Sequence, residues 1–69
     1  MKVIKQYDVF ELSKDINPTI IKGMSGVILE ICGVDSYEVE FVKEDGTNFE
    51  YNGQFTFTID RSFIGKISK

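Results

Sequence analysis

The side chains of this 69-residue sequence that could do chemistry are carboxylates, and they gather around its middle third. The set consists of Glu30, Asp35, Glu38, Glu40, Glu44 and Asp45. Paired carboxylates can hydrolyse glycosidic bonds or hold a hard cation. The sequence contains no histidine, so the commonest general base and the commonest metal ligand are missing. It also lacks a calcium-loop pattern, and we therefore expect no catalytic residue, no metal site and no cofactor.

Acidic and basic residues are unevenly distributed along the chain. Residues 30–50 contain seven acidic residues and one lysine, whereas the remainder contains four acidic and seven basic residues. With a net charge of −3, the chain lacks the basic stripe of a nucleic-acid-binding protein, so nucleic acid is not an expected partner. The single cysteine, Cys32, and the absence of a long apolar run predict a cytoplasmic protein without a membrane span.

Two alternating segments, Val27–Cys32 and Tyr37–Val42, are expected to position the acidic residues as paired strands. The expected inward face consists of Val27, Leu29, Ile31, Tyr37, Val39 and Phe41. The expected outward face carries Glu30, Glu38 and Glu40. Two registers keep all three glutamates in water, one pairing Glu30 with Glu40 and the other pairing Glu30 with Glu38. A shift by one residue would put glutamates and core residues on one face, and is not expected.

Two segments precede this pair. Tyr7–Leu12 has the composition of a first strand, with Leu12 and either Val9 or Phe10 pointing inward. Ser13–Ile21 contains the only proline and is expected to form a loop with three isoleucines. These are Ile16, Ile20 and Ile21. They either cover one end of the core or form an apolar patch for a partner.

Four turns connect the predicted strands. Lys22–Gly26 has two glycines that can supply positive φ and close backbone approach, which indicates a structural turn. Gly33–Ser36 forms the reversal between the two acidic strands, and its glycine can adopt a left-handed conformation. Asp45–Gly46 and Asn52–Gly53 are both typical of hairpin turns.

The C-terminal third of the chain predicts further strands. Asn48–Tyr51 reads as a short strand, and Gln54–Ile59 alternates. The inward residues of the second segment are expected to be Phe55, Phe57 and Ile59. Asp60 is placed to cap one helical turn that ends at Phe63. Ile64–Ile67 is expected to return as a last strand beside the first.

These elements predict an all-β protein with a single domain over residues 1–69, a small five- or six-stranded barrel with one helical turn at Asp60–Phe63. The layout resembles an SH3-like barrel through its long first loop, the Lys22-Gly23-x-x-Gly26 turn and the Tyr37-Glu38-Val39-Glu40-Phe41 strand. More narrowly, the same residues resemble a family of short, uncharacterised bacterial proteins. The Asn52–Gly53 turn and the strand that follows it depart from that pattern.

In size and charge the sequence also resembles the small acidic immunity proteins that neutralise basic nuclease toxins. Glutamates that face each other across a strand pair cost about 0.2–1 kcal/mol per pair, and a small domain has little stability to spare. We therefore expect the six acidic residues to bind a basic protein partner. The resemblance to immunity proteins implies that this partner is a nuclease-type toxin. The alternatives are a solvated acidic surface and an accessory domain of a ribosomal, transcriptional or enzyme assembly. An enzymatic role is not expected.

Overall fold

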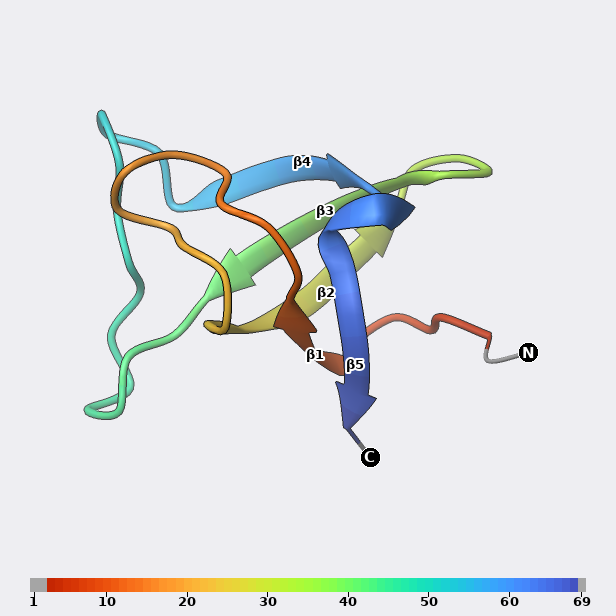
Figure 1. Ribbon diagram of the computed structural model, residues 1–69, viewed down its shortest axis with the longest axis horizontal. Coiled ribbons are helices and arrows are strands. Elements are labelled where there is room, and N and C mark those ends of the chain that lie inside the picture. The colour runs from red at the N-terminus through yellow and green to blue at the C-terminus, as the bar shows by residue number, and fades with distance from the viewer. Residues whose placement is uncertain (1–2, 69) are drawn as a thin grey trace.

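The computed structural model describes residues 3–68, and its regular elements are five β-strands and one 3-10 turn (Figure 1). They are β1 (Val9–Leu12), β2 (Ser25–Ile31), β3 (Ser36–Phe41), β4 (Thr56–Asp60), η1 (Arg61–Phe63) and β5 (Ile64–Ser68). The expected all-β class is confirmed. Within residues 3–68 no helix has the length and apolar character needed to cross a membrane. Residues 1, 2 and 69 of the expected domain lie outside the described residues.

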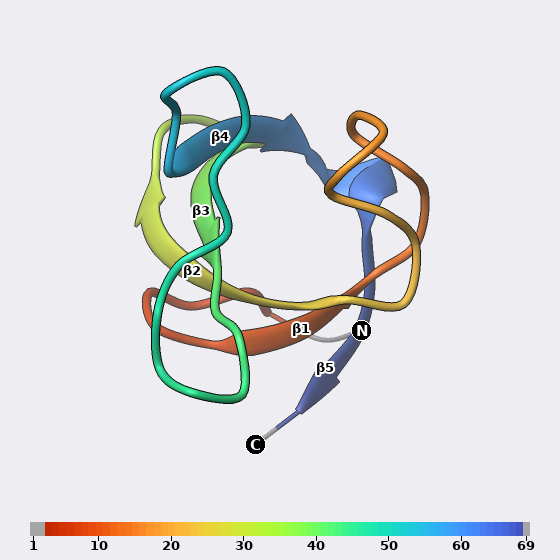
Figure 2. The ribbon, with the colours of Figure 1, turned by 90° about the vertical axis from the view of Figure 1, so that its left-hand side faces the viewer.

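The five strands form one antiparallel sheet in the order β4-β3-β2-β1-β5. Figure 2 shows the sheet curling so that its two edge strands, β4 and β5, approach each other through η1. The expected return of the last strand to the first is confirmed, because β5 pairs with β1. In the described residues the sheet is not closed by a ladder between β4 and β5.

The core lies inside the curl of the sheet. Its fully buried side chains are Phe10, Leu12, Ile20, Ile28, Val39 and Phe41. The Phe41 ring is central, since its centroid lies 5.8 Å from that of Phe10 and 6.1 Å from that of Phe57. Burial of each large apolar side chain stabilises the fold by about 1.5–3 kcal/mol. The sequence left open whether Val9 or Phe10 points inward with Leu12. In the structure Phe10 is buried and Val9 faces outward.

Gly23, before β2, and Gly26, the second residue of β2, have the structural duties that the sequence predicts. Gly23 has a φ of 96° and donates its N–H to the Leu12 carbonyl at 2.8 Å. At Gly26 a Cβ atom would lie 2.6 Å from the Phe10 ring and 2.7 Å from the Phe41 ring. Only a residue without a side chain lets both rings pack there.

The predicted inward face of β2 is wrong at Val27 and Leu29, whereas Ile31 lies opposite the buried Tyr37 but is 45% exposed. Val27, Leu29 and Ile31 are not in the core, and Ile28 is fully buried instead. The sequence Val27–Leu29 is uniformly apolar, so alternation could not decide which side faces inward. The ring contacts at Gly26 decide it, because they put Gly26 on the inward side and Ile28 follows two residues later.

The pairing of β2 with β3 changes register once. Val27 lies opposite Glu40 and Ile28 opposite Val39, which is the one-residue shift that the sequence argument excluded. An irregularity between Ile28 and Glu30 then restores one of the two predicted registers, the one in which Glu30 lies opposite Glu38. The extra residue on β2 lets Ile28 face the core and Glu30 face outward, although residues two positions apart in a regular strand lie on the same face.

The loop before β2 covers one end of the core, as one of the two sequence alternatives predicts. Ile20 is fully buried and Ile16 packs partly against the core, whereas Ile21 is 45% exposed. The Asn17 side-chain oxygen accepts hydrogen bonds from the N–H groups of Thr19 and Ile20 at 2.9 and 2.8 Å. This local turn holds Ile20 over the core.

The connection from β3 to β4 departs from the expectation in two places. The predicted strand Asn48–Tyr51 is absent, and only isolated bridges join Val42 to Asn48 and Tyr51 to Gln54. The Asn52–Gly53 turn forms as expected, with positive φ at both residues. Phe55 was expected in the core but is 50% exposed, because β4 begins after it.

Two further expectations for the C-terminal third are confirmed. Phe57 and Ile59 are buried. Asp60 caps η1, since its side chain accepts hydrogen bonds from the N–H of Ser62 at 2.8 Å and from the Ser62 hydroxyl. These two bonds lower the pKa of Asp60 below its ordinary value of 3.8.

The reversal between β2 and β3 differs from the expectation, because Gly33 does not adopt a positive φ there.

Candidate functional site

Three glutamates lie together on the outward face of β2 and β3. Glu30 and Glu38 are direct partners across the two strands, and Glu40 follows Glu38 by two residues on the same face of β3. Like charges in this arrangement repel, at a cost of about 0.2–1 kcal/mol for the opposed pair. We call these three residues the acidic face.

Hydrogen bonds from neutral groups orient two of these carboxylates. Glu38 accepts a hydrogen bond from the Thr58 hydroxyl on β4 at 2.8 Å, and Glu40 accepts one from the Asn48 side-chain amide at 2.8 Å. Both glutamates are half-buried, whereas Glu30 is exposed. The donors carry no charge, so they fix the carboxylates without neutralising them.

Apolar side chains border the acidic face on the β1 side. Val9 lies opposite Val27, which in turn lies opposite Glu40. Val9 is 40% exposed, and Val27 and Leu29 are half-buried. Sequence reasoning missed this border because it placed Val27 and Leu29 in the core. A partner of the acidic face would therefore meet apolar surface next to negative charge.

The other three predicted site residues lie elsewhere. Asp35 lies in the reversal before β3, and Glu44 and Asp45 lie beyond its opposite end. Figure 1 shows the two connections, residues 32–35 and residues 42–55, leaving β3 in opposite directions. A six-residue strand separates them by roughly 20 Å. The structure thus groups Glu30, Glu38 and Glu40 and does not bring the six acidic residues together.

Asp45 is held in a tight turn at the start of the β3–β4 connection. Its Oδ1 atom accepts hydrogen bonds from the Thr47 N–H at 3.0 Å and from the Thr47 hydroxyl at 2.7 Å. Gly46 closes the turn with a φ of 91°, as the Asp–Gly sequence predicts. The hydrogen bonds from Thr47, helped by the charge of Lys43, lower the pKa of Asp45 below 3.8. Its carboxylate is therefore ionised at neutral pH.

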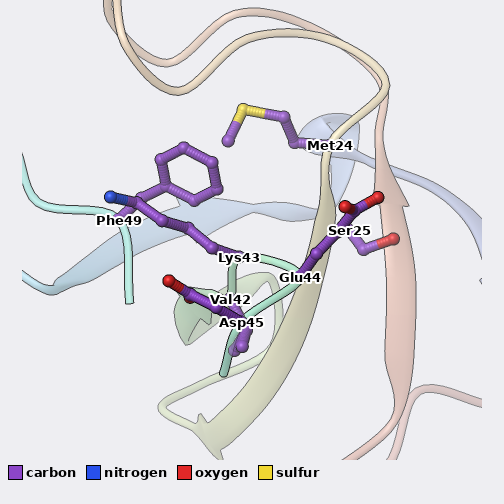
Figure 3. Close-up of a pocket in the computed structure, with 7 residues that line it drawn as sticks. All are labelled: Met24, Ser25, Val42, Lys43, Glu44, Asp45 and Phe49. Carbon is purple, nitrogen blue, oxygen red and sulfur yellow. The ribbon is translucent and has the colours of Figure 1, made fainter. Parts of the chain in front are cut away.

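A hollow of about 680 Å³ lies between this connection and the residues that open β2 (Figure 3). Half-buried apolar side chains of Met24, Val42 and Phe49 line it, together with the exposed Ser25. Its charged residues are Lys43, Glu44 and Asp45. Figure 3 shows the Met24 side chain extending toward the Phe49 ring. The Lys43 ammonium lies 5.3 Å from the centre of that ring.

No pattern in the sequence signals this hollow. Met24 and Phe49 are far apart along the chain and meet only because the β3–β4 connection folds back toward the turn before β2. Two of its charged residues, Glu44 and Asp45, belong to the predicted acidic set, but the sequence reasoning assigned them to a single surface with the glutamates of the strands.

The described residues offer little to bind a metal. No group of three or more histidine, cysteine, aspartate or glutamate side chains within residues 3–68 is placed to hold a metal ion. Cys32 is exposed and forms no disulfide within residues 3–68. No protein-family model, curated protein or solved structure matches this chain. The acidic face and the hollow are therefore the features of the molecule that bear on its function.

Proposed function

We propose that this protein is an SH3-like barrel that binds a basic protein through the acidic face, and that it acts as an immunity protein against a nuclease-type toxin. The five antiparallel strands, the long loop after β1 and the single helical turn before β5 support the SH3-like assignment. The chemistry of the acidic face supports the assignment to a basic partner.

The direct pairing of Glu30 with Glu38 carries this proposal. Folding alone does not favour it, because threonine at either position would keep the strand and remove the repulsion. The charge of Glu40 on the same face adds to the repulsion, and the hydrogen-bond donors to Glu38 and Glu40 are neutral. Lysine and arginine side chains of a partner would relieve the repulsion and would be steered toward the face at long range.

Inhibition would follow from occupation of the cationic cleft in which a nuclease holds its substrate. Nucleases contact phosphate groups with lysine and arginine side chains, and carboxylates can pair with the same groups. Glu38 and Glu40 project from one face of β3 about 7 Å apart along the strand. Two anionic groups on a rigid sheet would therefore replace two phosphates while the sheet itself excludes the substrate.

Reversal of charge on the face tests this proposal. The partner is first recovered from the native host by affinity purification and identified by mass spectrometry. Its affinity for the wild-type protein and for the Glu30→Lys/Glu38→Lys variant is then measured by calorimetry at several salt concentrations. We expect a loss of about 100-fold or more in affinity and a steep salt dependence in the wild type.

The matched control is Glu50→Lys, which changes the charge of an exposed residue outside the face. Unchanged affinity of a folded double variant would refute the proposal. A toxin inhibitor should also co-purify in equal amounts with one small basic protein and suppress its nuclease activity. Recovery with a ribosomal, transcriptional or multienzyme complex would instead support the accessory-domain alternative.

A further inference from the structure

The hollow at the β3–β4 connection is a second feature that folding does not explain. Its volume of about 680 Å³ lies within the range of about 300–1,000 Å³ that is typical of ligand sites. It exceeds the volume of one amino-acid side chain and suits a short peptide segment. The hollow is open to solvent, and it combines three half-buried apolar side chains with exposed charged ones.

The charges at the rim favour a cationic occupant. Glu44 and the ionised Asp45 outnumber Lys43. Both hydrogen bonds that Asp45 accepts from Thr47 fall on Oδ1, so Oδ2 keeps its capacity to accept a bond from a ligand. An arginine side chain matches this chemistry, because its guanidinium donates to carboxylates and its methylene chain packs against apolar surface.

Lys43 gives the hollow an internal cation. Its ammonium lies over the face of the Phe49 ring, at 5.3 Å from the centroid, within the distance of a cation–π contact. The position that a bound cation would prefer is thus already taken by a side chain of the same protein. A cationic ligand would compete with Lys43 both for the Phe49 ring and for the carboxylates.

Backbone hydrogen bonds hold the walls of the hollow in place. Lys43 N–H donates to the Thr47 carbonyl at 2.7 Å, and Phe49 N–H donates to the Phe41 carbonyl at 2.8 Å. On the opposite wall the Met24 sulfur accepts a hydrogen bond from the Ile21 N–H at 3.1 Å. A site that is formed before the ligand arrives loses little affinity to ordering.

We infer that the hollow binds a short basic and apolar segment of a polypeptide, with an arginine or lysine side chain at Glu44 and Asp45 and apolar side chains against Met24, Val42 and Phe49. This inference deepens the proposed function, and it rests on that function only in assigning the segment to the same basic partner. The acidic face would contact the charged surface of the partner, while the hollow would select one segment of it.

Titration of the folded protein with a synthetic peptide tests the inference. The probe is a capped leucine–arginine–leucine tripeptide, and the readout is the chemical shift of each backbone amide in ¹⁵N-labelled protein. We expect saturable shifts confined to the amides of residues 24–25 and 42–49. A capped leucine–glutamate–leucine tripeptide is the control and should bind at least about tenfold more weakly, because its charge has the wrong sign.

Two single substitutions at the rim should change the affinity in opposite directions. Glu44→Gln removes a carboxylate and should weaken binding of the arginine peptide by about threefold, whereas Lys43→Gln removes the competing cation and should strengthen it by about threefold. Glu50→Gln, at an exposed position outside the hollow, should leave the affinity unchanged. All three positions are exposed, and circular dichroism checks that each variant is folded.

Absence of saturable shifts, equal binding of the glutamate peptide, or weaker binding in Lys43→Gln would each overturn the inference. Shifts confined to the outward residues of β2 and β3 would also overturn it, because the peptide would then occupy the acidic face alone. These results are separable from the proposed function. The peptide can bind the hollow in a protein whose Glu30→Lys/Glu38→Lys variant keeps its partner, and the reverse can also hold.

Discussion

The inward and outward faces of β2 and β3 differ in what fixes their side chains. On the inward face Ile28, Val39 and Phe41 are fully buried, and Gly26 leaves room for the two rings that pack over it. On the outward face Glu30 and Glu38 oppose each other despite their like charge. The inward residues are explained by the stability of the fold, whereas the outward pair lowers it. Substitutions on the two faces should therefore change stability in opposite directions.

The largest effect is expected at the centre of the inward face. Phe41→Ala removes a fully buried ring that contacts two other phenylalanines, and should lower the free energy of unfolding by about 3–5 kcal/mol. Urea denaturation followed by circular dichroism measures the change. Val34→Ala, at a position that is 94% exposed, should shift stability by less than about 0.5 kcal/mol. A loss at residue 41 no larger than that control would contradict the described core.

A smaller loss is expected at Gly26, where the added atom is a single methyl group. Gly26→Ala should destabilise by about 1–3 kcal/mol because two packed rings must move. Gly33→Ala is the matched control, since the nearest atom to its Cβ would be 3.9 Å away and its φ is not positive. Equal stability of the two variants in urea would show that the rings do not pack on Gly26 as described.

On the outward face the sign of the effect should reverse. Glu30→Thr removes the charge opposite Glu38 and adds a residue suited to strands, so we expect a gain of about 0.2–1 kcal/mol. The part of this gain that comes from charge should shrink in 1 M salt, where repulsion is screened. Glu50→Thr provides a control at an exposed acid outside the sheet. Destabilisation by Glu30→Thr at low salt would contradict the claim that the opposed glutamates lower the stability of the fold.

The smallest effect is expected at the cap of η1. The folded-state pKa of Asp60 is lowered by hydrogen bonds from Ser62, so the ionised form stabilises the fold above the unfolded-state pKa. This contribution is lost as the pH falls through the folded-state pKa. Asparagine can also cap a helical turn but does not titrate. Between about pH 5 and pH 2 the urea midpoint of Asp60→Asn should therefore fall less than that of the wild type. Parallel pH profiles would contradict this assignment.

The accuracy of the prediction for each strand depends on how strictly its polar and apolar residues alternate. In β3 polar and apolar residues alternate without exception, and the predicted inward set Tyr37, Val39 and Phe41 is confirmed. In β2 three apolar residues follow Gly26 without a break, and the inward side is decided by ring contacts with residues distant in sequence. Such contacts leave no periodic pattern in the sequence, so the predicted inward side of Val27–Leu29 was wrong.

The candidate site was likewise predicted only in part. Glu30, Glu38 and Glu40 were predicted to share a face because they lie at alternating positions, and they do. Asp35 and Asp45 were grouped with them by nearness in sequence, although the length of β3 lies between the two. The hollow depends on the path of the long connection between β3 and β4. Turn residues such as Asp45–Gly46 predict where such a connection reverses but not where it packs.

The irregularity in β2 also bears on how the chain tolerates changes in its length. Val39 and Glu38 are consecutive on β3, but their partners Ile28 and Glu30 are separated by Leu29. A deletion in a strand ordinarily moves every later side chain to the opposite face. Removal of Leu29 would instead leave Ile28 opposite Val39 and Glu30 opposite Glu38. At this position the strand can become one residue shorter while the core and the acidic face both remain in place.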